Sequence, residues 1–283
     1  MKYAYYPGCS LEATAKEYDL SVRAVCANLG IELAELPDWS CCGASSGHNT
    51  NRWLAHALAG RNLALAESLG LDIAVACPAC YIRLRTTSHE MKANSQQRAE
   101  LAELIAMPYQ ASGNTRHFLD IICNDLGLES LRKKVVKPLR GLKLACYYGC
   151  YLVRPPEVVA FDDPENPQAM DELLDNLGAE VKDWSGKVDC CGGSLSLSKR
   201  EIAKQLVNEL TDMARKAGAQ AIVAACPLCH ANLETRQSAA RENKLPIFYF
   251  TELIGLAMGI TGVESWLKKH LISPFGLLAA YRL

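Results

Sequence analysis

Three features are missing from this 283-residue sequence, and each absence excludes a class of protein. There is no run of about 18 apolar residues, which a membrane-spanning helix would need. There is no excess of positive charge: the net charge is −1, so a large electrostatic attraction to nucleic acid is not expected. There is also no Gly-x-Gly-x-x-Gly fingerprint, which argues against a flavin or nucleotide site of that kind.

Cysteine is the residue type that the sequence has in excess, with 13 in all. The first residues, starting at Met1, have no apolar core of the kind that a secretory signal contains. We therefore expect a cytoplasmic protein whose thiols stay reduced. In that setting, many cysteines indicate metal or redox chemistry rather than structural disulfides.

The chain repeats itself once. The repeated segments are 5–9 and 147–150, 41–43 and 190–192, and 77–80 and 226–229. The last two pairs share one sequence offset, and the Pro-rich, acidic stretch 154–168 is the expected insertion in the second copy. The length suits two domains, so the repeat predicts an internal duplication. We assign 1–131 to the first domain, 132–142 to a linker, and 143–283 to the second domain with a C-terminal helical extension.

Both copies predict the same order of strands and helices. The expected strands are 2–6, 31–34 and 72–76 in the first copy, and 143–148 and 221–225 in the second. The expected helices are 13–29, 51–69 and 92–107, then 171–177 and 199–217. This alternation predicts an α/β fold: two pseudo-symmetric domains, each with a short parallel sheet and flanking helices. The repeated cysteines lie where strands end, which is where open α/β sheets place their ligands.

Each half contains five repeated cysteines. The spacings are Cys-x31-Cys-Cys-x34-Cys-x2-Cys and Cys-x39-Cys-Cys-x34-Cys-x2-Cys. Neighbouring thiolates repel each other unless a cation binds both, so the Cys-Cys pair favours a centre with several metal ions. One zinc ion or one regular cubane cluster needs only four ligands. The candidate metal ligands are Cys9, Cys41, Cys42, Cys77, Cys80, Cys150, Cys190, Cys191, Cys226 and Cys229.

The other cysteines and the basic run have simpler interpretations. Cys26, Cys123 and Cys146 lie in apolar context and are expected to pack as small hydrophobic side chains. The basic run 132–143 is typical of a solvated linker, and the alternative is docking onto an acidic redox partner. It lacks interleaved aromatic residues, so nucleic acid is not an expected partner.

The paired motifs closely resemble the CCG domains of the heterodisulfide reductase B-subunit family. Both copies match the family pattern of a lone Cys, then Cys-Cys-Gly, then Cys-Pro-x-Cys, and the ending 266–270 is also similar. The resemblance implies two non-cubane [4Fe-4S] clusters, one in each half with five cysteines apiece, facing each other across a disulfide substrate. Some relatives have zinc in one half, so one cluster plus one zinc ion is the alternative.

The resemblance also implies a function. The chain would be the catalytic subunit of a heterodisulfide reductase-like complex that reduces, or forms, a thiol/disulfide substrate. Its partners would be a cubane iron–sulfur subunit, similar to the C subunit of heterodisulfide reductase, and a flavin subunit, similar to its A subunit. Protons are needed as thiolates form, and His48 and His230 lie nearest to the cysteines in sequence; a structural role is the alternative for both.

Two other functions stay open. The chain can be a non-catalytic electron-transfer subunit, or an anchoring subunit of a quinone reductase, as some CCG relatives are. It can also be a structural zinc scaffold. Iron and sulfide analysis would separate the scaffold from the two redox functions.

Overall fold

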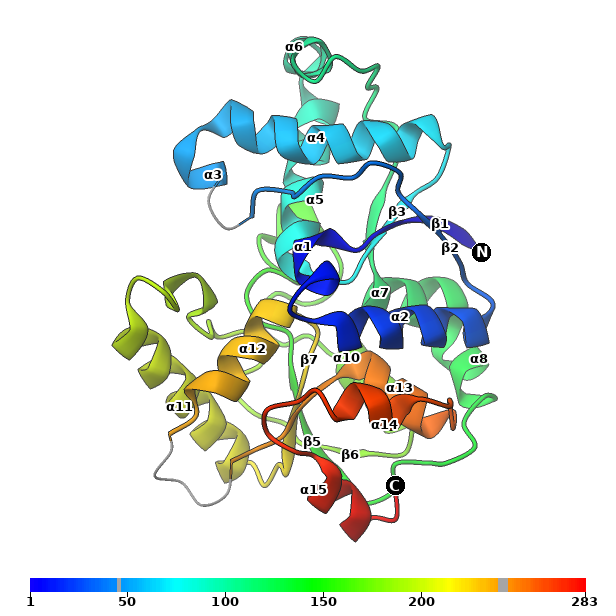
Figure 1. Ribbon diagram of the computed structural model, residues 1–283, viewed down its shortest axis with the longest axis vertical. Coiled ribbons are helices and arrows are strands. Elements are labelled where there is room, and N and C mark those ends of the chain that lie inside the picture. The colour runs from blue at the N-terminus through cyan, green and yellow to red at the C-terminus, as the bar shows by residue number, and fades with distance from the viewer. Residues whose placement is uncertain (45–46, 239–243) are drawn as a thin grey trace.

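The computed structural model describes residues 1–44, 47–238 and 244–283 (Figure 1). Within these residues the chain forms two four-stranded sheets, with strand orders β2-β1-β3-β4 and β6-β5-β7-β8. Every strand pair is parallel. The first sheet comes from the first half and the second sheet repeats its order, so the predicted α/β fold with two similar halves is confirmed.

The first half builds its sheet from short strands that alternate with helices. In chain order the elements are β1 (Lys2–Tyr6), α1 (Gly8–Glu12), α2 (Lys16–Leu29), β2 (Glu32–Glu35), α3 (Gly47–Thr50), α4 (Arg52–Ser68), β3 (Ile73–Val75), α5 (Pro78–Ala93), α6 (Ser95–Leu104), β4 (Thr115–His117), α7 (Phe118–Asp120), the π-helix η1 (Ile121–Gly127) and α8 (Leu128–Arg132). All three residues of β3 are buried because helices cover the sheet.

The second half follows the same plan. Its elements are β5 (Lys143–Tyr147), α9 (Pro156–Val159), α10 (Ala169–Asn176), β6 (Glu180–Val181), the 3-10 helix η2 (Gly193–Leu195), α11 (Arg200–Lys216), β7 (Ala221–Ala224), α12 (Pro227–Arg236), β8 (Ile247–Tyr249), α13 (Phe250–Ala257), α14 (Val263–Leu267) and α15 (Phe275–Ala280). The expected insertion contains α9, whose Val158 carbonyl oxygen accepts a 2.6 Å hydrogen bond from Arg85 of α5.

Two predicted helices need correction. The continuous helix expected over 92–107 is wrong, because α5 ends at Ala93 and a new helix, α6, starts after Asn94. The Asn94 side chain accepts a 3.0 Å hydrogen bond from the backbone N–H of Gln97, which is a typical helix start. The helix expected from residue 13 begins later, at Lys16, because the short helix α1 precedes it.

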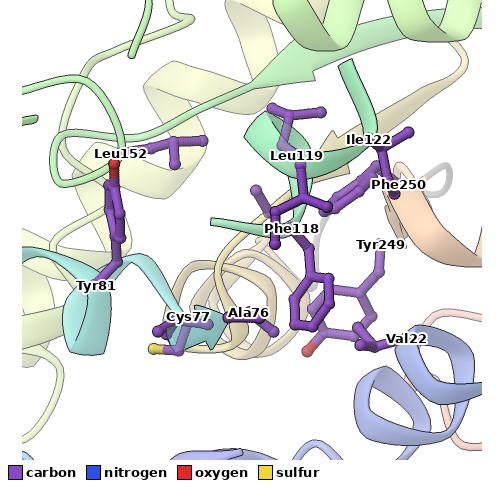
Figure 2. Packing of buried hydrophobic residues seen from close by; sticks show 14 of the residues in the cluster. Val22, Ala76, Cys77, Tyr81, Phe118, Leu119, Ile122, Leu152, Tyr249 and Phe250 are labelled. Carbon is purple, nitrogen blue, oxygen red and sulfur yellow. The ribbon is translucent and has the colours of Figure 1, made fainter. Parts of the chain in front are cut away.

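The two halves share a hydrophobic core. Helix α2 of the first half packs against α13 and α14 of the second half, as Figure 1 shows below the blue helix. Tyr18 stacks on Tyr249 with ring centroids 4.0 Å apart. Figure 2 labels side chains from both halves in this one cluster, among them Val22, Phe118 and Phe250. The core therefore holds the two sheets at a fixed distance, while the domain boundaries given above stay a prediction.

Candidate metal centres

The repeated cysteines lie at the carboxyl ends of the strands in both halves. Cys9 belongs to α1, directly after β1, and Cys150 follows β5. The Cys-Cys pairs lie in the loops after β2 and β6. Cys77 and Cys226 follow β3 and β7 and are the N-cap residues of α5 and α12. The same edge of each sheet therefore presents all five cysteines of its half, as the strand order requires.

In the first half the thiols form a close group. The Sγ atoms of Cys42 and Cys80 are 3.3 Å apart, and those of Cys9 and Cys41 are 3.9 Å apart. The backbone N–H of Gly43 donates to the Cys41 sulfur at 3.5 Å. Cys9 and Cys41 are exposed, whereas Cys42 and Cys80 are buried. The group therefore runs from the surface into the interior.

The second half repeats this arrangement. The Sγ atoms of Cys191 and Cys229 are 3.4 Å apart, and the N–H of Gly192 donates to the Cys190 sulfur at 3.3 Å. Interaction with Cys190 is the main cause that raises the pKa of Cys150. Cys190 is exposed, while Cys191 and Cys229 are buried. The two groups are therefore similar in geometry as well as in sequence.

These distances fit metal binding. Two sulfurs bound to one tetrahedral ion at about 2.3 Å lie about 3.8 Å apart. The measured separations of 3.3, 3.4 and 3.9 Å are close to this value. The thiols can therefore bind a metal centre with small movements of their side chains, and five per group can hold more than one ion.

Hydrogen bonds among the thiols prepare each group for a cation. Thiol donors at Cys41 and Cys80 lower the pKa of Cys42. A hydrogen bond from Cys150 likewise lowers the pKa of Cys190. The thiolate is the form that binds metal. Each group thus contains at least one cysteine with a lowered pKa, Cys226 being a second one in the second group, and cation binding can displace the remaining protons.

The two groups meet at Cys77 and Cys226. Both thiols are buried, and interaction with Cys226 across the boundary between the halves is the main cause that raises the pKa of Cys77. The pKa of each also responds to a neighbour in its own group, Cys80 for Cys77 and Cys229 for Cys226. The ten cysteines therefore form two adjoining centres rather than two distant ones.

The sequence interpretation missed two tyrosines that support the Cys-Cys loops. The hydroxyl of Tyr6 donates to the carbonyl oxygen of Ser40 at 2.8 Å. The hydroxyl of Tyr147 donates to the carbonyl oxygen of Asp189 at 2.6 Å. Ser40 and Asp189 each directly precede a Cys-Cys pair. Both tyrosines occupy the same place in the repeat, three residues before the lone cysteine, so the duplication itself was the available signal.

The glycines of the Cys-Cys-Gly loops have a structural role. Gly43 and Gly192 have φ angles of +73° and +72°, a left-handed conformation that L side chains rarely adopt. A Cβ at Gly43 would lie 2.7 Å from Leu58 of α4, and one at Gly192 would lie 3.0 Å from Ala203 of α11. Glycine therefore allows each loop to turn directly over its following helix.

The predicted proton donors lie in different surroundings. His48 is half-buried in α3, and among the described residues its buried Nδ1 has no hydrogen-bond partner. His230 is buried, its Nε2 lies 3.0 Å from the carbonyl oxygen of Ile247, and its ring stacks on Tyr249 at 4.1 Å. His230 thus interacts with β8 through its ring edge and face. A role in proton supply stays a prediction for both histidines.

The three other cysteines are core residues. Cys26 lies in α2 and Cys146 in β5, and both are fully buried. Cys123 is half-buried in η1, where its thiol donates to the carbonyl oxygen of Ala169 at 3.5 Å. The basic stretch from Lys133 to Gly141 follows α8, outside any helix or strand.

Comparison with known proteins identifies similar chains. The cysteine-rich domain family CCG matches residues 3–85 and 144–234. The chain is 30% identical over 279 residues to the 8-methylmenaquinol:fumarate reductase membrane anchor subunit of Wolinella succinogenes, covering 96% of this chain and 97% of that protein. It is 30% identical over 292 residues to the B subunit of the Ferredoxin/F(420)H(2)-dependent CoB-CoM heterodisulfide reductase of Methanosarcina acetivorans, covering 98% and 96%. It is 31% identical over 274 residues to a protein of Archaeoglobus profundus that is named as similar to the heterodisulfide reductase B subunit, covering 92% and 91%.

A solved structure supports the fold. A hypothetical protein from Helicobacter pylori matches 96% of this chain with a TM-score of 0.75 at 12% identity. The chain spans about half of that protein, 52% of its length. Within the part of the chain that the structure describes, no helix combines the length and the apolar character needed to cross a bilayer.

Proposed function

Because the chain belongs to the CCG cysteine-rich family, which includes the B subunits of heterodisulfide reductases, we propose that it is the disulfide-reducing subunit of such a complex. As a CCG protein it is an iron–sulfur electron-transfer subunit of an oxidoreductase. The proposal adds that a disulfide is cleaved, or formed, at the adjoining cysteine centres of this chain.

The contact between the two cysteine groups supports this proposal most strongly. Reduction of a disulfide requires two electrons and two protons: R–S–S–R′ + 2 e⁻ + 2 H⁺ gives RSH and R′SH. An iron–sulfur cluster in each group would supply one electron and a Lewis-acidic iron. The Cys77–Cys226 contact keeps the two groups adjacent, so both sulfurs of one disulfide can be reached from one position.

The side chains around the centres would position the reaction. Tyr6 and Tyr147 fix the two Cys-Cys loops through their carbonyl hydrogen bonds, so the geometry of each group is set before substrate binds. The exposed Cys9, Cys41 and Cys190 mark the side from which a substrate or partner would approach. His48, half-buried six residues after Cys42, is the proposed proton donor on the first side.

The cofactor and partner assignments follow from the same family. We assign one non-cubane [4Fe-4S] cluster to each group of five cysteines, with one cluster plus one zinc ion as the alternative. Electrons would come from a cubane iron–sulfur subunit of the C-subunit type, which would receive them from a flavin subunit of the A-subunit type. The cytoplasm is the proposed location. The two relatives named after the heterodisulfide reductase B subunit support the complex.

A second candidate function is electron relay without disulfide chemistry. It rests on the relative from Wolinella succinogenes, which is named as a membrane anchor subunit of a fumarate reductase and matches 96% of this chain. In that case the centres would pass electrons between a partner and a quinone, and no substrate sulfur would bind.

Steady-state turnover separates the two functions. The chain, purified anaerobically, would be given reduced methyl viologen and either the CoB-CoM heterodisulfide or a soluble naphthoquinone. Disulfide-dependent viologen oxidation with release of two thiols per disulfide supports the first function. Quinone reduction without any thiol release, from protein with intact clusters, would replace it with the second.

A further inference from the structure

A buried group of metal-binding side chains lies on α12, outside the two cysteine centres. His230 and Glu234 are one helical turn apart on α12, and His270 follows α14. Their exposed fractions are 4%, 6% and 8%. One donor atom from each lies within 4.8 Å of the other two.

Hydrogen bonds determine which nitrogen of each histidine is available. Nε2 of His230 lies 3.0 Å from the carbonyl oxygen of Ile247, which can only accept, so Nε2 carries the hydrogen. Nε2 of His270 lies 2.9 Å from the carboxylate of Glu252, so it is also the donor. In the neutral rings, both Nδ1 atoms therefore carry a lone pair.

The two lone pairs face one carboxylate. Nδ1 of His230 is 3.9 Å and Nδ1 of His270 is 3.8 Å from oxygens of Glu234. These separations are too long for hydrogen bonds. Among the described residues, the buried Nδ1 of His270 has no hydrogen-bond partner. Three electron-pair donors thus lie close together, and when both rings are neutral neither Nδ1 carries a hydrogen toward Glu234.

The surroundings favour a cation at this point. Both oxygens of Glu234 accept backbone N–H groups, from Leu271 at 3.1 Å and Ile272 at 3.3 Å, so the carboxylate is held in place. Within the described residues, no lysine or arginine pairs with Glu234 or with the buried Glu252; His270, 3.8 Å from Glu234 and 2.9 Å from Glu252, is the basic group shared by both. A buried carboxylate is costly unless it is paired or binds a metal.

We propose that His230, Glu234 and His270 form a binding site for one zinc ion. Two imidazoles and one carboxylate suit zinc, whereas calcium and magnesium prefer oxygen ligands. Ligands of a tetrahedral zinc ion lie about 3.3 Å apart, so any two donors would need to approach by less than about 1.5 Å. Glu252 behind His270 completes the carboxylate–histidine–zinc arrangement that orients such ligands.

The site ties the C-terminal segment to the second cysteine centre. Helix α12 carries Cys226 at its N-cap and Cys229 in its first turn, and His270 lies 41 residues after Cys229. Zinc at this site would fix α12 through His230, which directly follows Cys229, and through Glu234 one turn later. It also means that zinc in the purified protein need not occupy a cysteine centre.

Zinc X-ray absorption on the anaerobically purified, cluster-containing chain tests the proposal. After addition of one equivalent of zinc and gel filtration, we expect about one zinc per chain. Its ligands should be nitrogen and oxygen at about 2.0–2.1 Å, without sulfur at about 2.3 Å. Glu234→Gln and His270→Ala should each lower zinc retention at least tenfold without changing iron content. His89→Ala and Glu103→Gln, at exposed positions, should retain it.

Three results would overturn the proposal. The first is a wild-type chain, with clusters intact, that retains no zinc. The second is zinc bound only by sulfur, which would place it in a cysteine centre. The third is undiminished zinc in Glu234→Gln. Because the wild-type spectrum is decisive alone, a variant that fails to fold does not weaken the test.

Discussion

Tyr18, in the first half of the chain, donates a 2.9 Å hydrogen bond to the carbonyl oxygen of Ala225 in the second half. Its hydroxyl also lies 3.2 Å from the carbonyl oxygen of Ala76. Ala76 and Ala225 directly precede Cys77 and Cys226, the two cysteines that meet between the halves. One buried hydroxyl therefore fixes the distance between the strand ends from which both cysteine centres begin.

Removing this hydroxyl should weaken the whole fold. Tyr18→Phe keeps the ring stacked on Tyr249 but leaves the Ala225 carbonyl without its donor. Ala76 retains a second partner, because Nε2 of His117 lies 2.8 Å from its carbonyl oxygen. A buried acceptor without a partner costs about 1–3 kcal/mol. We expect the free energy of unfolding to fall by that amount, measured by urea titration under anaerobic conditions.

Tyr281→Phe is the matched control. The Tyr281 hydroxyl bonds to Gln220 at 2.8 Å in a partly exposed position, where water can replace it. We expect a loss of less than about 0.5 kcal/mol there. An equal fall in the free energy of unfolding in the two variants would show that the hydrogen bond between Tyr18 and Ala225 stabilises the fold no more than a partly exposed one does.

Tyr6 and Tyr147, which hydrogen-bond to the Cys-Cys loops, should each stabilise metal binding only in their own half of the chain. Tyr6→Phe removes the hydrogen bond to Ser40, and Tyr147→Phe removes the one to Asp189. Ser40 keeps its two hydrogen bonds with Asn62, so the first loop is loosened rather than freed. Each loosened loop should release metal more easily from its half. We expect iron loss to a chelator to become biphasic, with about half of the iron leaving at least threefold faster. Uniform release of all the iron in both variants would contradict separate support of the two centres.

The sequence predicted the repeated parts of the fold better than the unrepeated ones. The strand ends, the five cysteines per half and the glycine-ended helices recur, so each copy supports the interpretation of the other. The edge strands β4, β6 and β8 were missed, because none is longer than three residues and none has a repeated cysteine motif directly at its end. The link from Tyr18 to Ala225 joins residues 207 apart, and no local pattern predicts such a contact.

The site shows the same limit. The predicted strand ends account for the position of the cysteines in each half, because the carboxyl ends of parallel strands lie at one edge of a sheet. Whether Cys77 lies beside Cys226 depends on how the two sheets pack against each other. The spacing of the cysteines along the sequence does not predict that packing. The sequence interpretation noted His270 only as part of the ending 266–270, which is similar to that of the family. Its contact with Glu252 depends on the path of the chain after α14.

Metal analysis should find about eight irons per chain, four for each group of five cysteines. The protein must be purified without oxygen, because exposed thiolates and clusters oxidise. Zinc with nitrogen and oxygen ligands beside about eight irons agrees with both proposals above. About four irons with sulfur-bound zinc would instead establish one cluster plus one zinc ion, and zinc without iron would exclude a redox function.

The two centres should be individually necessary for disulfide reduction. Cys42→Ser and Cys191→Ser each remove one buried thiol from one group, at 3.3 Å from Cys80 and 3.4 Å from Cys229. Each change should damage only the cluster of its own half, because the two ligand sets are separate. Either change should nevertheless lower disulfide turnover at least a hundredfold, since one remaining centre supplies one electron at a time and the reaction needs two.

Cys123→Ser is the control for these variants. Its thiol, in η1, donates to the backbone carbonyl of Ala169 in α10, a bond that a serine hydroxyl can also make, so turnover should stay within about twofold of the wild type. The measurement is viologen-driven disulfide reduction, read beside the spectrum of the surviving cluster. If Cys42→Ser or Cys191→Ser lost its cluster and still reduced disulfide substantially, a single centre would be sufficient. The two-centre requirement would then be wrong, while disulfide reduction by this chain would stand.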